Sequence, residues 1–387
     1  MKAPQGKRKE EGTLSRILTP GDEYTFAEGL RHLSRREALK AGLIGGGAVL
    51  LASCGGAAAT PTSAPASGLP EGMTRFPAEL TDIWPWGVID AQISAQQILA
   101  DKLGYYADEG LVVRNQLIQS GPDIGSMIAG GSAPVSFDAT IDVIIIKGHG
   151  VNCRILTPTN NAGGTQAVVC RPDLNLTSAR DLEGKTIGMP GGAGTLIAIR
   201  GMAQQLGVDV SRINFINMMP ADAIPALEAG DIDCMGAWEP WITQAVKLGN
   251  TFLMSGTRAE FPELSGPVNW MAFHGTFQVT DDYIQSYPNS WRAMIRALKR
   301  ATDFVNNSRD QAVEILSGEL HIEATDLREM MNRNVYSMAV DEAFVNGCDA
   351  MADLCVEFGY IDEKPSFDSY TDFAFLGDVA PELVTAA

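Results

Sequence analysis

Residues 178–208 read SARDLEGKTIGMPGGAGTLIAIRGMAQQLGV, and this stretch decides the fold. A short capped helix leads into the run 185–189, whose apolar residues predict a β-strand. Glycines follow, and then apolar residues recur at helical spacing from Thr195 onward. A strand, a glycine-rich turn and a helix in this order predict one unit of a parallel sheet with crossover helices.

The same alternation of strands and helices extends to both sides of this stretch. Strands are predicted, in chain order, at 80–86, 112–119, 133–140, 152–160, 165–172, 213–219, 232–238 and 251–255. From residue 281 onward the pattern is mainly helical, and helical spacing predicts these core residues: Trp291, Ile295, Leu298 and Val305. The sequence therefore predicts an α/β fold of two lobes, each a mostly parallel sheet flanked by helices. The first lobe is expected to consist of residues 76–170 together with 273–387, and the second of residues 171–272. Two crossing segments are expected to join them.

The N-terminal region has the composition of an export signal. Residues 33–54 read LSRREALKAGLIGGGAVLLASC, in which a basic part with paired arginines precedes an apolar part. The apolar part is shorter than the about 20 residues that a membrane-spanning helix needs, and its three consecutive glycines disfavour a stable helix. The arginine pair resembles a twin-arginine signal, and residues 51–54 resemble a lipobox, which predicts lipidation of Cys54. Residues 1–53 are thus expected to be a twin-arginine-like lipoprotein signal.

The segment that follows is expected to be a flexible tether. Residues 55–70, GGAAATPTSAPASGLP, are small, rich in proline and uncharged, and such a composition forms no core of its own. We assign residues 54–75 to this tether. Together with the lipid at Cys54, it predicts a protein that is held outside the cell membrane by its anchor.

The charge and composition exclude several classes of partner. The 387 residues carry a formal net charge of −18, whereas nucleic-acid binding requires basic patches. The cysteines show no C-x-x-C spacing and the histidines lie far apart, so neither a metal site nor a cofactor is expected. We expect a monomer. Cys153 and Cys170 flank predicted strands and are either small buried side chains or partners in a disulfide.

Two loops at predicted strand ends are the main candidates for binding. In 189–196, MPGGAGTL, the glycines Gly192 and Gly194 allow close approach of a ligand, and the helix start at Thr195 favours an anion. In 236–241, GAWEPW, the ring of Trp238 and the carboxylate of Glu239 suit an amine or a ring with N–H groups. The alternatives are a plain tight turn in the first loop and a helix cap formed by Glu239 in the second.

Weaker candidates lie in the first lobe. The loop IWPWGV, 83–88, presents Trp84 and Trp86, which either bind a ligand or pack beneath the loop. Asp138 and Thr140 follow a predicted strand, where Asp138 either contacts a ligand or caps the next helix. Thr165 lies near the expected crossing between the lobes. Ligands of open α/β sheets bind at the carboxyl ends of strands, so each of these positions is a candidate for contact with a ligand.

Known enzyme signatures are missing from the sequence. It contains neither a G-x-S-x-G elbow nor an H-E-x-x-H pair, so no catalytic residue is assigned. An exported enzyme on the same fold remains an alternative, and its nearest candidates for a reactive group are Lys147 and His149. A sensory ectodomain is a further alternative.

Several segments together resemble a known family. GYYADEGL (104–111), DLEGKTIGMPGGAGT (181–195) and AIPALEAGDIDCMGAWEPW (223–241) resemble periodic segments of the substrate-binding proteins of bacterial ABC importers. The resemblance is to the nitrate-, sulfonate- and taurine-binding group, which includes binders of thiamine-pyrimidine precursors. It spans roughly residues 80–360 and implies the type II periplasmic-binding-protein fold, whose two lobes close over a small solute delivered to a permease.

The resemblance also implies roles for individual residues. Thr195 would hold the anionic or carbonyl end of the solute, and Trp238 with Glu239 would hold the other end. Trp84, Asp138 and Thr140 would line the first lobe. The expected solute is small and polar, of the sulfonate, taurine or nitrate kind, and a pyrimidine-type thiamine precursor is the alternative.

Overall fold

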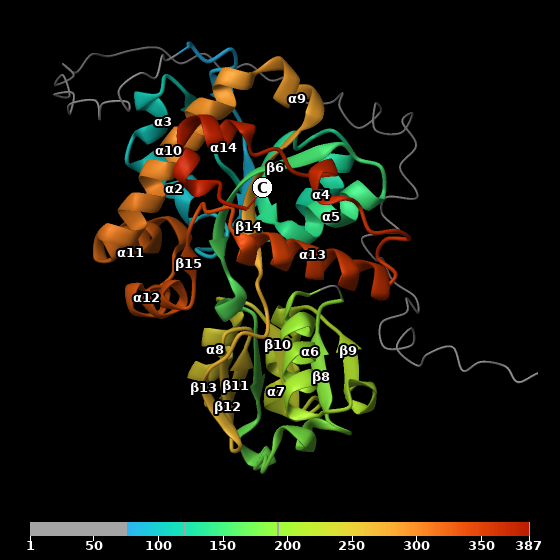
Figure 1. Cartoon of the computed structure of the whole chain (residues 1–387). Coiled ribbons are helices and arrows are strands. Elements are labelled where there is room, and N and C mark those ends of the chain that lie inside the picture. The colour runs from blue at the N-terminus through green and yellow to red at the C-terminus, as the bar shows by residue number, and fades with distance from the viewer. Residues whose placement is uncertain (1–75, 120, 192, 387) are drawn as a thin grey trace, which may run out of the picture.

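The computed structural model describes residues 76–119, 121–191 and 193–386. These residues form two lobes, each built on one β-sheet with helices against it (Figure 1). The expected signal, the tether and Cys54, as well as Gly192, lie outside the described residues.

The first lobe contains a six-stranded mixed sheet in the order β15-β6-β14-β5-β2-β4. Strand β2 pairs in parallel with β4 and β5, whereas β14 runs antiparallel to both β5 and β6, and β15 is antiparallel to β6. A separate two-stranded ribbon pairs β1 with β3. The bounds of these strands are β1 Asp82–Ile83, β2 Trp86–Val88, β3 Val112–Val113, β4 Gln116–Ile118, β5 Val135–Ala139, β6 Cys153–Asn161, β14 His274–Thr280 and β15 Val335–Tyr336.

The second lobe contains a seven-stranded mixed sheet in the order β13-β12-β11-β7-β10-β8-β9. The parallel pairs are β8 with β9 and β8 with β10, and the remaining neighbours are antiparallel. The bounds are β7 Ala167–Cys170, β8 Thr186–Met189, β9 Asn214–Asn217, β10 Cys234–Ala237, β11 Thr251–Ser255, β12 Arg258–Phe261 and β13 Leu264–Pro267.

Helices cover the sheets of both lobes. In the second lobe these are α6 Thr195–Leu206, α7 Pro220–Ala229 and α8 Trp241–Lys247. In the first lobe they are α2 Ala95–Lys102, α3 Tyr105–Asp108, α4 Gly121–Ala129, α5 Thr140–Gly148, α9 Asp281–Ser286, α10 Pro288–Asn307, α11 Arg309–Leu320, α12 Ala324–Asn332, α13 Glu342–Glu357 and α14 Ala374–Val379. Figure 1 shows α13 on the side of the first lobe that faces the second.

The predicted two-lobe α/β architecture is confirmed, but the sheets are mixed rather than mostly parallel. The reason lies in how the chain returns to the first lobe. Strand β14 enters the middle of the first sheet from the second lobe, so it runs opposite to its neighbours β5 and β6. Strand β7, which lies within the expected first lobe of 76–170, pairs with β10 and β11 in the second sheet.

Two short segments connect the lobes. One joins β6 to β7 through 162–166, and the other joins β13 to β14 through 268–273. The two segments are hydrogen-bonded to each other, because the Ala162 N–H donates to the Phe273 carbonyl. The turn between β11 and β12 also contacts the first segment, because the Gly256 N–H donates to the Gly163 carbonyl. Two adjacent and short connections restrict the lobes to a hinge-like relative movement.

The core of the first lobe is organised around α10. All four residues predicted from helical spacing are fully buried there, namely Trp291, Ile295, Leu298 and Val305. Trp291 packs against Phe277 of β14, with ring centroids 6.4 Å apart. Burial of one face of this 20-residue helix is what its amphipathic pattern predicts.

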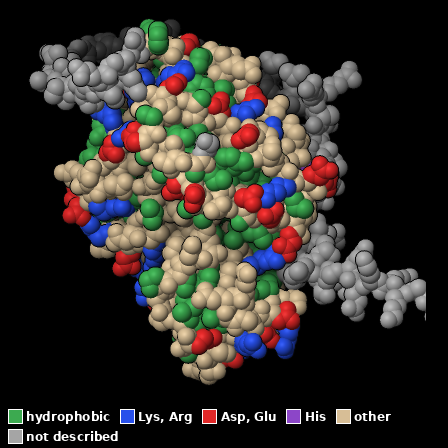
Figure 2. Space-filling model, in the orientation of Figure 1, with side chains coloured by type: hydrophobic (Ala, Val, Ile, Leu, Met, Phe, Trp, Pro, Cys, Tyr) green, Lys and Arg blue, Asp and Glu red, His purple; other side chains and the backbone are tan. Residues whose placement is uncertain are grey.

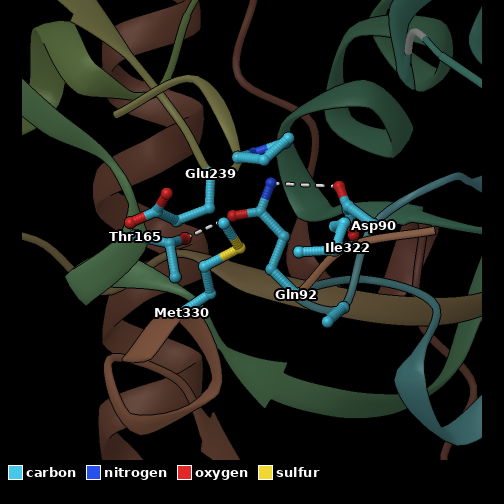
Figure 3. A pocket seen from close by; sticks show the side chains of 8 residues that line it. Asp90, Gln92, Thr165, Glu239, Ile322 and Met330 are labelled. Atoms are coloured by element: carbon cyan, nitrogen blue, oxygen red, sulfur yellow. Dashed lines mark hydrogen bonds between the residues drawn. The ribbon is translucent and has the colours of Figure 1, made fainter. Parts of the chain in front are cut away.

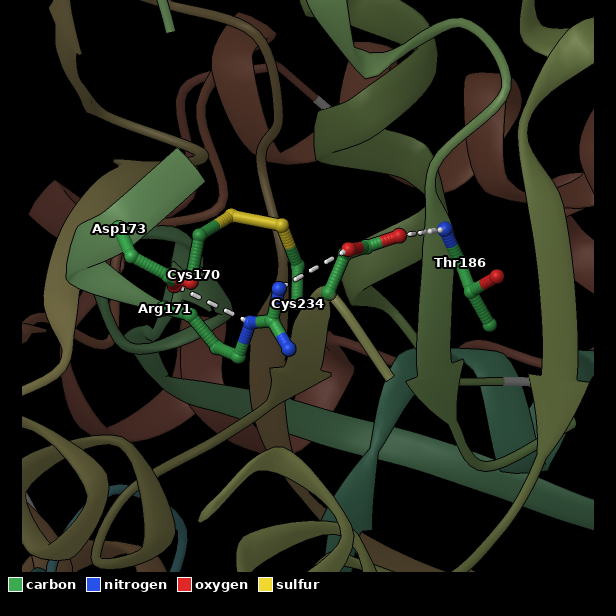
Figure 4. The surroundings of a disulfide bond; sticks show 6 residues. Cys170, Arg171, Asp173, Thr186 and Cys234 are labelled. Carbon is green, nitrogen blue, oxygen red and sulfur yellow. Dashed lines mark hydrogen bonds and ion pairs between the residues drawn. A yellow bond between two sulfur atoms is a disulfide. The ribbon is translucent and has the colours of Figure 1, made fainter. Parts of the chain in front are cut away.

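A disulfide joins Cys170 to Cys234, and Cys153 is a free cysteine (Figure 4). The two residues are directly opposite each other in the antiparallel pair of β7 and β10, with Cα atoms 3.9 Å apart. Cys153 lies in the other lobe and is buried, as are Cys348 and Cys355. The sequence did not indicate this pairing because it depends on the register of two strands that lie 64 residues apart.

The surface carries both signs of charge, and acidic and basic side chains are spread over the face of both lobes shown in Figure 2. Among the described residues, no helix is both long enough and apolar enough to cross a membrane. The same residues contain no group of three or more side chains that could hold a metal ion.

Candidate functional site

A small cavity lies where the two lobes face each other (Figure 3). The carboxyl ends of β2, β5 and β6 form the edge of the first sheet here, and the carboxyl ends of β8 and β10 form the facing edge of the second. The lining comprises Asp90, Ala91, Gln92, Thr165, Glu239, Pro240, Ile322 and Met330. Its volume of about 10 Å³ is room for about one water molecule. A solute of several heavy atoms therefore enters only if the lobes separate or side chains move.

The first lobe presents a hydrogen-bonded pair of polar side chains to this cavity. Asp90 follows β2, and its Oδ1 accepts a hydrogen bond of 2.7 Å from the N–H of Ile93, which fixes the turn before α2. Its Oδ2 accepts from Gln92 Nε2 at 3.0 Å. The amide oxygen of Gln92 accepts in turn from the hydroxyl of Thr165 in the first crossing segment. The chain of three residues thus connects the first lobe to the hinge.

The second lobe presents Glu239, which makes contacts in two directions. The carboxylate follows β10, and its Oε2 accepts a hydrogen bond of 3.0 Å from the Thr243 N–H in the first turn of α8, so Glu239 does cap this helix. Its Oε1 forms an ion pair with Arg333, which follows α12 in the first lobe. This ion pair bridges the two lobes beside the cavity.

Burial shifts the pKa of both acids at the cavity upward. The buried environment of Asp90 raises its carboxyl pKa to about 6, although hydrogen bonds from Ile93 and Gln92 act in the opposite direction. Burial also raises the pKa of Glu239, and the positive charge of Arg333 opposes that rise. The Asp90 carboxyl group is therefore expected to carry negative charge above about pH 6, and among the described residues the ion pair with Arg333 involves Glu239 and not Asp90.

Two of the residues predicted from the sequence, Thr165 and Glu239, line the cavity. Thr195 and Gly194 lie at the start of α6, as predicted, but the Thr195 side chain is fully buried. Its hydroxyl donates to the Ala237 carbonyl at 3.1 Å. Gly194 contacts the ring of Phe273, because a Cβ at this position would lie 2.6 Å from that ring. Their contact with a solute stays a prediction.

Asp138 and Thr140 lie at the carboxyl end of β5, on the same edge of the first sheet, but neither is among the residues that line the cavity. Thr140 Oγ1 donates to the His274 carbonyl at 3.1 Å. Burial and the negative charge of Asp142 raise the pKa of Asp138 well above its usual range, and burial raises that of Asp142 to about 7. The Oδ1 atom of Asp138 accepts a hydrogen bond of 2.8 Å from the Ala139 N–H, and its buried Oδ2 has no hydrogen-bond partner among the described residues.

The tryptophans of the first lobe lie away from the cavity. Trp84 and Trp86 precede β2 or begin it, so they are at the opposite end of the strand from Asp90. Trp84 is 54% exposed and stacks with Arg114, at 5.4 Å. The predicted strand at 80–86 ended too early, since the strand that reaches the cavity is 86–88. Trp238 is half-buried in the second lobe beside Glu239.

Lys147 and His149, the candidates for a reactive group in an enzyme, lie at the far end of α5 from the cavity. The helix begins with Thr140 at the carboxyl end of β5, and Lys147 lies in its last turn, where its amine donates to Asn152 Oδ1 at 3.0 Å. The buried cysteines also lie outside the cavity lining.

Three functional candidates were missed from the sequence: Asp90, Gln92 and Arg333. The signal for the first two was present, since the polar residues of DAQ follow directly after the apolar end of β2. Arg333 gave no such signal, because its position opposite Glu239 arises only when residues 94 positions apart meet in the fold.

A family model described as NMT1/THI5 like matches residues 93–312, which is more than half of the chain. The chain belongs to the NMT1/THI5-like family. The matched range includes β5, β6, β8, β10 and Glu239, but it begins after Asp90 and Gln92 and ends before Arg333. The resemblance predicted from the sequence motifs is thereby confirmed.

Relatives of known sequence are named as binding proteins. A protein from Brucella abortus (strain 2308) that is named as a binding protein is 24% identical over 283 residues, which cover 71% of this chain and 83% of the relative. A protein from Bacillus subtilis (strain 168) that is named for aliphatic sulfonate binding is 20% identical over 285 residues, or 72% and 83% of the two chains. These names support the expectation that this family member is a binding protein rather than an enzyme.

Solved structures share the fold. The periplasmic aliphatic sulphonate binding protein from Escherichia coli aligns with a TM-score of 0.62 and 15% identity, covering 75% of this chain and 91% of that one. The periplasmic nitrate-binding protein from Synechocystis aligns with a TM-score of 0.60 and 16% identity, covering 79% and 90%. At this identity the likeness establishes the type II periplasmic-binding-protein fold that was expected from the sequence.

Proposed function

We propose that this protein is the solute-binding component of an ABC importer and captures a small sulfonate- or nitrate-like solute between its two lobes. The observation that carries the proposal is the interlobe cavity, to which both lobes and one crossing segment contribute polar groups. Contacts made from both sides favour the closed form when a solute is bound, and closure is the signal that a permease reads. The family and the names of the relatives support this function.

A thermal-shift screen of the purified full chain tests the solute class. The panel contains alkanesulfonates, taurine, nitrate, bicarbonate, aminopyrimidines and amino acids. A ligand that binds only the folded state raises the melting temperature, by roughly several degrees at one hundred times its Kd. A shift with sulfonates or nitrate supports the proposal, whereas shifts confined to another class contradict it.

A pyrimidine-type solute is a second candidate. The carboxylates of Asp90 and Glu239 are acceptors on opposite sides of the cavity, which suits a ring with N–H donors. A melting-temperature shift with aminopyrimidines that is lost in Asp90→Asn would favour this solute over an oxyanion.

We further propose that the protein acts outside the cell membrane and is anchored there through a lipid on Cys54. The lipobox-like residues 51–54 and the arginine pair support this location. Cys54→Ser should release the protein from the membrane fraction of the producing cell, and Cys348→Ser should not. Retention of the Cys54→Ser variant in the membrane fraction would contradict the anchor.

A further inference from the structure

The ion pair between Glu239 and Arg333 differs from the other ion pairs that join the lobes. Lys247 pairs with Asp326 at 2.6 Å between α8 and α12, and its side chain is 58% exposed. Glu239 is only 3% exposed and lines the cavity. Among the ion pairs of the described residues, Glu239–Arg333 is the one that includes a cavity-lining side chain. This ion pair therefore lies at the cavity, whereas the Lys247–Asp326 pair is a surface contact.

Arg333 has the geometry of an oxyanion receptor. Its guanidinium lies over the ring of Phe252 in the second lobe, 5.5 Å from the centroid, while its backbone belongs to the first lobe. The hydrogen bond to Glu239 is made by Nη1, and across the described part of the chain no other nitrogen of this guanidinium has one. A guanidinium presents its N–H donors as a planar fork that matches two oxygens of a sulfonate, nitrate or carboxylate.

The charges at the cavity oppose the entry of a bare anion. With Asp90 and Glu239 ionised and Arg333 as the paired cation, the cavity carries one negative charge in excess. An oxyanion that kept this ion pair intact would meet two carboxylates and no available cation. It gains a favourable partner only by taking the place of the Glu239 carboxylate at Arg333.

We propose that Arg333 is the residue that selects oxyanion solutes, and that Glu239 is an internal competitor which occupies Arg333 until a solute displaces it. This inference rests on the proposed function, since it assigns Arg333, which lies beside the cavity and pairs with its lining residue Glu239, as the group that would hold the solute's anionic end. After displacement, Glu239 keeps its hydrogen bond from the Thr243 N–H, so the carboxylate is not left without a donor. The competition sets the affinity, because each bound solute must break an ion pair whose carboxylate is buried and whose guanidinium is partly exposed.

Titration calorimetry with butanesulfonate, nitrate and butylamine tests this inference on the full chain. Glu239→Gln removes the competing charge and keeps the shape, so it should bind butanesulfonate and nitrate at least about tenfold more tightly than the wild type, a gain of about 1.4 kcal/mol. Arg333→Gln should lose oxyanion binding. Arg333→Lys should bind more weakly than the wild type, because an ammonium cannot form the planar fork.

Lys247→Met provides the matched control, because it removes an interlobe ion pair that lies outside the cavity lining. If the Glu239 pair were only a contact between the lobes, Glu239→Gln and Lys247→Met would change the binding of all three probes in the same way. That result would overturn the inference. Tighter butylamine binding without tighter sulfonate binding in Glu239→Gln would also overturn it.

The double variant Glu239→Gln/Arg333→Gln guards against misfolding of Arg333→Gln, because it replaces the ion pair by two neutral amides. It should melt as cooperatively as the wild type and bind neither oxyanion. Retained oxyanion binding in a folded double variant would overturn the assignment of Arg333 alone. By contrast, the absence of oxyanion binding in both the wild type and Glu239→Gln would overturn the proposed solute class together with this inference.

Discussion

The two lobes are built on sheets of similar size but are held together differently. The first lobe is assembled from two remote parts of the chain, since β14 and β15 join strands from residues 86–161, and its core is the buried face of α10. The second lobe is one continuous stretch from β7 to β13, and a disulfide joins two of its neighbouring strands. The first lobe thus depends on long-range packing, and the second has a covalent bond between its central strands.

This difference extends to the cavity. The second lobe contributes the consecutive residues Glu239 and Pro240. The first lobe contributes residues from 90–92 and from around α12, which are more than 200 positions apart. A binding surface made by one loop can be found in a sequence, whereas one made by two remote segments exists only after folding.

The largest expected effect is the loss of the first lobe's central side chain. Trp291→Ala should lower the free energy of unfolding by about 5 kcal/mol, because it removes a fully buried indole and its contact with Phe277. Urea unfolding measures the loss, and hydrogen exchange should localise it to peptides of the first lobe. The control is Trp84→Ala, at an exposed tryptophan, which should change stability by less than about 1 kcal/mol. Equal losses of unfolding free energy in Trp291→Ala and Trp84→Ala would contradict the view that the first lobe depends on its packing around α10.

The disulfide should have its main effect on the second lobe. Replacing Cys170 and Cys234 by alanine opens a loop of 64 residues and should cost about 4 kcal/mol on the chain-entropy model. Faster hydrogen exchange is expected in β7 and β10, with smaller changes around α10. A reducing agent should destabilise the wild type to the same extent and leave the double variant unchanged. If the reducing agent also destabilised the double variant, its effect would not come from the Cys170–Cys234 disulfide.

The buried carboxyl group of Asp90, at the cavity between the lobes, should make the free energy of unfolding depend on pH. Burial raises the pKa of Asp90 from 3.8 to about 6, so the folded state binds this proton more tightly than the unfolded state. Its contribution to stability therefore falls as the pH rises from about 4 to about 6, by about 3 kcal/mol at most. The stability of Asp90→Asn relative to the wild type should rise over this range. The buried His274, whose pKa is lowered to about 4, acts in the opposite direction in both proteins and cancels in the difference.

A flat difference between Asp90→Asn and the wild type from pH 4 to pH 7 would contradict the burial of an ionised carboxylate at this site. Asp173→Asn in the second lobe is the control, because that carboxylate pairs with Arg171 at the surface. Its difference from the wild type should stay within about 0.5 kcal/mol over the same range.

The smallest effect is expected where the lobes meet at the surface. Arg200 of α6 pairs with Glu357 of α13 across the lobes, and both side chains are partly exposed. Arg200→Met should therefore lower the free energy of unfolding by less than about 1 kcal/mol. Thermal unfolding of Arg200→Met and the wild type in low and in high salt measures this loss. High salt screens the ion pair, so the two proteins should differ less in stability there than in low salt. A loss of several kcal/mol would mean that this surface ion pair, and not the Glu239–Arg333 pair beside the cavity, holds the lobes together.

The fold was predictable in outline because its signals are local. From residue 281 onward the sequence predicted mainly helices, and the structure places α10 and α11 there, with the four predicted core residues buried on α10. The single strand predicted at 80–86 is two strands in the structure, since β1 (82–83) pairs with β3 and β2 (86–88) joins the six-stranded sheet. Thr165 and Glu239 were found because each lies next to a strand end. Asp90 was missed, since the strand before it was ended too early.

The sequence by itself determined the alternation of strands and helices, the two lobes, the family and the position of Glu239 after β10. Each of these depends on residues close together in the chain, where periodicity and turn residues fix the local conformation. The tertiary structure alone decided the mixed sheets, the pairing of Cys170 with Cys234, and the meeting of Glu239 with Arg333. These three features depend on strand register and on how the two lobes close. Each of them brings together groups that are dozens of residues apart in the chain.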